Sequence, residues 1–148
     1  MNLKEKINND LKEAMKSGDK SRINTVRSIR ALILEFEKSG ANKELTPEDE
    51  VRLLTSAAKK RKDSIEQFRN AGRMDLVEQE EAELKVLLEY LPKQLTEEEI
   101  KTEVEKIIQE TGAKGKEDFS KVMPTAMKAL KGQADGNLVR KIVESLLS

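Results

Sequence analysis

Apolar residues recur three or four positions apart along nearly the whole chain. The first segment shows the pattern, because Leu3, Ile7, Leu11, Ala14 and Met15 fall on one face of a helix. Runs of β-branched residues, which favour strands, are scarce. We therefore predict an all-α protein. The spacing predicts helices at about residues 2–17, 20–38, 47–70, 74–90, 97–111, 116–131 and 136–147.

Segments with capping residues, glycine or proline separate these helices. Thr46 is a favourable N-cap, and Thr96 with Glu99 has the spacing of a capping box. Gly40 is predicted to end the second helix and to begin a polar loop. Pro124 lies inside the sixth helix, and we predict that it kinks or splits this helix because proline lacks the N–H group.

Pro92 marks the predicted boundary between two domains. The residue before a proline disfavours helical geometry, so the fourth helix should stop there. We predict an N-terminal four-helix domain over residues 1–92 and a C-terminal three-helix bundle over residues 93–148, joined by a short proline-containing hinge. In the C-terminal bundle, Phe119 and Met127 are expected on the apolar, core-facing side of their helix.

The composition excludes several kinds of chemistry. The 148 residues include no histidine, cysteine or tryptophan. Zinc, haem and iron–sulfur sites, disulfides, cysteine nucleophiles and Ser-His-Asp triads are therefore not expected. We predict no metal, no cofactor and no catalytic residues. No stretch reaches the roughly 20 apolar residues that span a bilayer, so we expect no membrane contact and a soluble, cytoplasmic protein.

Charge is unevenly distributed although the formal net charge is zero. Residues 59–73 contain six basic and two acidic side chains, and residues 75–89 contain six acidic and one basic. We predict that these two helices pack antiparallel and pair their charges, an interpretation we favour over a binding surface. Glu80 and Glu83 are then partners of the basic helix, since a di-metal bundle would also require histidine.

The C-terminal segment carries the largest basic surplus at a chain end. Residues 112–148 contain seven basic and four acidic side chains, and many of the basic ones lie near glycine-bearing turns. Exposed amides beside lysines can hold a phosphate backbone. On charge alone, an ordinary solvated helical surface explains the pattern equally well.

Two groups of residues carry a family resemblance that covers nearly the whole chain. The run Lys59–Phe68, then Ala71-Gly72-Arg73, Glu80–Glu83 and Tyr90-Leu91-Pro92, resembles the YqeY family of small bacterial proteins. Further along, Lys121-Val122-Met123, Lys131-Gly132, Ala134-Asp135-Gly136 and Leu138-Val139 are similar to a domain shared with the end of the GatB subunit of tRNA-dependent amidotransferases. The resemblance implies an all-helical fold in two domains.

The resemblance also implies a function. The similar part of GatB helps to hold tRNA, while the chemistry lies in other domains and in a partner amidase subunit. We therefore expect a non-catalytic module that binds tRNA or another structured RNA. The expected contacts are Lys121, Lys128, Lys131, Arg140 and Lys141, with Gly132 and Gly136 allowing close backbone approach and Lys114 and Lys116 in support.

Two alternatives belong to other functional classes. The chain could be an adaptor that clasps a protein partner across the Pro92 hinge. The family label is amidotransferase-like and implies a carbon–nitrogen ligase with glutamine as amido-N-donor. We find neither an ATP site nor an amidase Ser-Ser-Lys arrangement in the sequence that would support that label.

Overall fold

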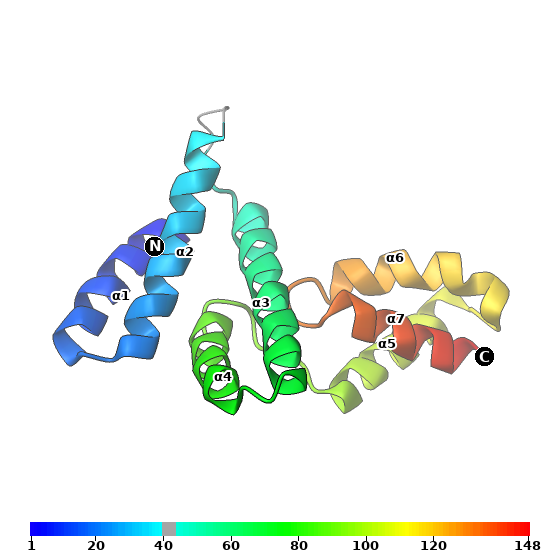
Figure 1. The fold of residues 1–148 in the computed structure, drawn as a ribbon. Coiled ribbons are helices and arrows are strands. Elements are labelled where there is room, and N and C mark those ends of the chain that lie inside the picture. The colour runs from blue at the N-terminus through cyan, green and yellow to red at the C-terminus, as the bar shows by residue number, and fades with distance from the viewer. Residues whose placement is uncertain (40–43) are drawn as a thin grey trace. The chain divides into compact units, whose positions relative to one another are not determined.

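The fold was obtained as a computed structural model, which describes residues 1–39 and 44–148. Over these residues the chain is all-α and contains no strand (Figure 1). None of the helices in the described ranges has both the length and the apolar character needed to cross a membrane. The helices are α1 (Leu3–Ser17), α2 (Lys20–Lys38), α3 (Pro47–Asn70), α4 (Met74–Leu88), α5 (Glu97–Thr111), α6 (Phe119–Ala129) and α7 (Gly136–Leu147), with a short 3₁₀ turn, η1 (Lys116–Asp118), before α6.

Contacts divide the chain into two compact units, Met1–Leu91 and Pro92–Ser148. In the first unit, α2 lies between α1 and α4, and α3 packs along α4 (Figure 1). Ile7, Ile29 and Leu54 are fully buried at the centre of this unit. Burying each such side chain contributes roughly 1.5–3 kcal/mol, so the helical stripes read from the sequence supply the stability of the unit.

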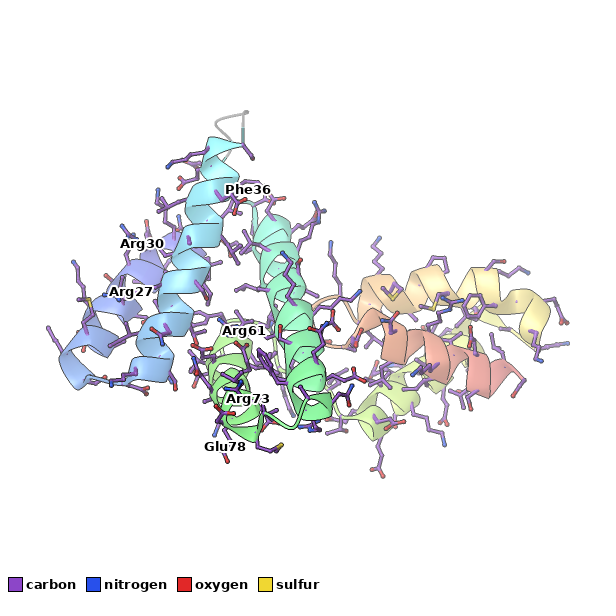
Figure 2. All side chains as sticks on the ribbon, viewed as in Figure 1. Arg27, Arg30, Phe36, Arg61, Arg73 and Glu78 are labelled. Atoms are coloured by element: carbon purple, nitrogen blue, oxygen red, sulfur yellow. The ribbon has the colours of Figure 1, made fainter. Side chains whose placement is uncertain are left out.

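The predicted pairing of the basic and acidic helices is confirmed. Arg61 on α3, labelled in Figure 2, lies 3.1 Å from the Glu80 carboxylate and 2.9 Å from the Glu83 carboxylate, both on α4. Its second terminal nitrogen donates to the hydroxyl of Ser28 on α2 at 3.2 Å. The Glu83 side chain is only 7% exposed. This partly buried network therefore joins three helices of the unit.

The second unit is built from α5, α6 and α7, each in contact with the other two. Ile100, Val104, Val122 and Val143 are fully buried in its core. Amphipathic helices of this size bury their apolar stripe by packing against one another. The polar faces of all three helices are left at the surface of the unit.

Most helix ends follow the local signals. Thr96 accepts a hydrogen bond from the Glu99 amide while the Glu99 carboxylate accepts one from the Thr96 amide, as predicted for a capping box. Pro124 does not split α6, which continues to Ala129. The carbonyl that loses its donor belongs to Ser120, and both residues are exposed, so water can replace the missing bond. Gly40 and the start of its loop lie outside the described residues.

Two expectations about the core are wrong. Met15 is 55% exposed and Met127 is 42% exposed. Each lies at the margin of its helical stripe, beside a small buried residue, Ala14 or Ala126, that faces the core in its place. The spacing of apolar residues indicates which side of a helix faces the core, but not how many residues at the margins of that side are buried.

Candidate functional site

The second unit is electrically polarised. Helix α5 carries six acidic and two basic residues, whereas residues 119–147, which form α6, α7 and their connection, carry five basic and two acidic ones. Such a distribution favours the approach of a polyanion from the side of α6 and α7. The basic residues of these two helices are therefore the place to look for a site.

Two of the expected lysines lie on the outer face of α6. Lys121 and Lys128 are seven residues apart, which puts them on the same side of the helix and about 10 Å apart along its axis. Both are exposed and lie opposite the buried Val122 and Ala126. Lys121 is 3.6 Å from Asp118, whereas Lys128 has no acidic partner among the described residues.

The two basic residues of α7 likewise differ in whether they pair with a carboxylate. Arg140 forms an ion pair with Glu144 one turn further on, at 3.1 Å. Lys141 is exposed and has no acidic partner within the described part of the chain. It lies opposite the buried Val139 and Val143 and so projects from the outer face of α7.

Where α6 connects to α7, Lys131 lies at the surface. The two glycines there, Gly132 and the first residue of α7, Gly136, lie against other atoms of the protein. Gly132 is buried, has φ +78°, and its carbonyl accepts a 2.6 Å hydrogen bond from the Gln94 side chain. A Cβ atom on Gly136 would lie 3.0 Å from the terminal methyl of Met127. Both glycines therefore allow close packing of this turn within the protein.

A groove lies at the opposite end of the α6–α7 pair. It is open and has a volume of about 770 Å³. Lys116 from η1, Phe119 from α6, and Arg140 and Lys141 from α7 line it, together with Glu144 and Leu147. The structure thus brings Arg140 and Lys141 together with Lys116, while Lys128 and Lys131 form a separate basic group where α6 ends.

The turn that presents Lys116 is held by Asp118. The Asp118 carboxylate accepts a 2.9 Å hydrogen bond from the backbone N–H of Lys114, and this bond holds the pKa of Asp118 below its usual value. The nearby ammonium of Lys121 acts in the same direction. The lowered pKa means that the carboxylate stays ionised, and able to accept this bond, at a more acidic pH than an ordinary aspartate.

Sequence reasoning placed Phe119 in the core and missed its second role. Phe119 is half-buried, packs against the core of the second unit and also lines the groove. The available signal was its rarity, because it is the one aromatic residue between Pro92 and Ser148. Among residues 1–39 and 44–148, no three acidic side chains are grouped so that they could hold a metal ion.

Three proteins similar to this chain come from fungi. A protein of Pyrenophora tritici-repentis named altered inheritance of mitochondria protein 41, mitochondrial, is 36% identical over 143 residues, which cover 93% of this chain and 77% of that protein. An uncharacterised protein of Schizosaccharomyces pombe is 37% identical over 62% of this chain and 73% of its own length. A third relative, from Lachancea thermotolerans, has the same name as the first and is 36% identical over 57% of this chain and 46% of its own length.

These relatives correct the expectation of a bacterial, cytoplasmic protein. All three are fungal, and two are named as mitochondrial. Helical periodicity and a lack of cysteine are shared by proteins of several compartments, so they could not determine this one. The model of the Yqey-like protein family matches residues 4–147. The chain therefore belongs to the YqeY-like family.

Proposed function

We propose that the C-terminal three-helix unit binds structured RNA, with tRNA as the expected class, through phosphate contacts from α6, α7 and the turn between them. The observation that carries the proposal is a set of exposed cations, Lys128, Lys131 and Lys141, that have no acidic partner among residues 1–39 and 44–148 and lie on the basic side of a polarised unit. Lys121 and Arg140 add charge from the same two helices. The resemblance to the tRNA-holding part of GatB supports the same function.

The physical basis is the release of counterions from the RNA backbone. A lysine that neutralises a phosphate displaces condensed cations from the RNA. The resulting gain in binding free energy is largest when the lysine is not already paired with a carboxylate. Arg140 must share its charge with Glu144, so it should contribute less than Lys141. With one aromatic side chain in this unit, recognition should depend on the shape of the RNA more than on its sequence.

We expect the two parts of the chain to have different roles. We expect the four-helix part, residues 1–92, and the three-helix part, residues 93–148, to be joined by a hinge at Pro92. Arg61 and Arg69 of α3 pair with carboxylates of the acidic helix α4, whereas α6 and α7 carry the basic surplus of a polarised unit. The C-terminal part is therefore the one expected to bind RNA.

The adaptor function remains the alternative. An adaptor needs a contiguous apolar surface. The large apolar side chains that are most exposed in the described residues are Met1, Met15, Leu34, Met74 and Met127, which belong to the N-terminus and to four different helices. Free cations on α6 and α7 favour RNA over a protein partner.

Crosslinking in cells, followed by sequencing of the bound RNA, tests the proposal. The chain is compared with a variant in which Lys128, Lys131, Arg140 and Lys141 are all changed to glutamine. We expect the unchanged chain to recover structured RNA and the variant to lose most of it, because four of five phosphate contacts are gone.

A matched control removes four exposed lysines of the N-terminal unit instead, Lys12, Lys59, Lys60 and Lys62, each changed to glutamine. This variant should recover as much RNA as the unchanged chain. Equal loss of RNA in both variants would contradict a site on α6 and α7. Recovery of one protein partner that survives nuclease treatment, without RNA, would replace the proposal with the adaptor.

A further inference from the structure

The groove between η1, the start of α6 and the second half of α7 offers more than charge. One part of its lining is apolar, from Phe119 and Leu147, and the rest is polar, from Lys116, Lys141 and Glu144. We infer that this groove receives one unpaired nucleotide of the bound RNA, with the base against Phe119 and the adjoining phosphates beside Lys116 and Lys141. This inference rests on the proposed RNA binding and names the part of the RNA that the groove contacts.

The apolar part of the groove fits a nucleobase. Phe119 is half-buried, so its position is fixed by the core of the unit while part of the side chain remains at the groove. Aromatic side chains stack on unpaired bases of any sequence, and each such contact strengthens binding by about 5- to 150-fold. Bases within a duplex are already stacked and do not offer a free face, so the contact selects an unpaired nucleotide.

The charged part of the groove fits the backbone on either side of that base. Lys116 and Lys141 have no acidic partner in the described ranges, and they come from η1 and α7 respectively. Glu144 is neutralised by Arg140 at 3.1 Å and can accept a hydrogen bond from a ribose hydroxyl. A purely apolar ligand would leave the two ammonium groups without a counter-charge, so a phosphate-bearing ligand complements the groove better.

The groove is also of a suitable size for one nucleotide. Its volume of about 770 Å³ lies within the range of roughly 300–1,000 Å³ that is usual for small-molecule sites. It is open to solvent and not an enclosed cavity, so a nucleotide can enter while it stays connected to the rest of the RNA. One inserted base with its neighbouring phosphates is therefore compatible with both volume and access.

The experiment compares two RNAs of the same stem-loop, one blunt-ended and one with an unpaired 3′ overhang, by fluorescence anisotropy. We expect the overhang to tighten binding by about tenfold. Phe119→Leu keeps an apolar side chain for the core but removes the aromatic ring, so the ratio of the two affinities should fall to near one. Lys116→Gln, which does not touch the core, should lower the same ratio and serves if the leucine variant is poorly folded.

A spectroscopic measurement locates the base directly. The chain has no tryptophan, so Phe119→Trp introduces a single indole whose fluorescence should be quenched by the overhang RNA and not by the blunt one. Phe68→Trp, at a half-buried phenylalanine of the N-terminal unit, is the matched control and should not respond to either RNA. If both RNAs bind equally well and the indole at position 119 does not respond, the groove inference is wrong while RNA binding stands. If neither RNA binds, both are wrong.

Discussion

Removing Arg61 should destabilise the N-terminal unit strongly. The Arg61 side chain, on α3, is 16% exposed and donates to Glu80 and Glu83 on α4 and to Ser28 on α2. In Arg61→Met the aliphatic volume is largely retained, but Glu83, only 7% exposed, loses its counter-charge. A buried carboxylate without a partner is far less stable than a paired one.

The expected loss follows from burial. Removing one partner of a buried ion pair lowers the free energy of unfolding by about 3–5 kcal/mol. In a unit of this size, each 1 kcal/mol lowers the melting temperature by roughly 4–8 °C, so a loss of 3 kcal/mol lowers it by about 12–24 °C. A second change, Glu83→Leu in the Arg61→Met background, removes the unpaired charge and should recover most of the lost stability.

The assay uses the one tyrosine of the chain. Tyr90 lies in the N-terminal unit, and no tryptophan masks its fluorescence, so urea unfolding followed at this residue reports the first unit. The matched control is Arg69→Met, because Arg69 pairs with Glu81 across the same two helices at 2.9 Å while both side chains are more than half exposed. The control should lose less than about 1 kcal/mol.

Equal losses in the two variants would refute this reasoning, because the pairs have the same separation and differ in exposure. A failure of Glu83→Leu to restore stability would refute it as well. In that case the loss would come from packing around the Arg61 stem and not from an unpaired charge.

Three further predictions concern stability and titration. Ile100→Ala should cost the C-terminal unit about 2–5 kcal/mol, measured by hydrogen exchange of its core amides, because Ile100 is completely buried. Gly112→Ala should cost about 1–2 kcal/mol by the same measurement, because Gly112 has φ +71° and no atom lies near enough for the cost to be steric. Burial raises the pKa of Tyr90, and a hydrogen bond to Asp10 adds to the effect, so absorbance titration should show a midpoint above 10 that falls part of the way back in Asp10→Asn. Since the folded pKa is the higher one, this contribution to stability is complete below pH 10 and is lost as the pH rises further; a midpoint at 10 would contradict it.

The sequence predicted features that depend on near neighbours. The capping box of Thr96 and Glu99 formed as expected because its partners are three residues apart. The pairing of α3 with α4 followed from two oppositely charged helices joined by a short turn. The burial of Arg61 and Glu83 could not be predicted, because it depends on Ser28 and the packing of α2 against α4.

The candidate site was predicted only in part for the same reason. The basic residues of α6 and α7 are visible as a charge surplus over residues 112–148, which can be counted without knowing the fold. The groove arises where the start of α6 meets the end of α7, about 25 residues later, so periodicity gave no sign that Phe119 lines it. The sequence also did not indicate that the Gly132 carbonyl accepts a hydrogen bond from Gln94 or that Met127 lies against Gly136, because both contacts depend on tertiary packing.

The salt dependence of RNA binding tests the central claim most directly. The five proposed phosphate contacts of Lys121, Lys128, Lys131, Arg140 and Lys141 should contribute about −3.5 to −4.5 to the slope of the logarithm of the association constant against the logarithm of salt concentration. With four of these residues changed to glutamine and Lys121 retained, the slope should become shallower by about 2.8 to 3.6. An unchanged slope in that variant, or no binding by the unchanged chain near physiological ionic strength, would contradict RNA binding by α6 and α7.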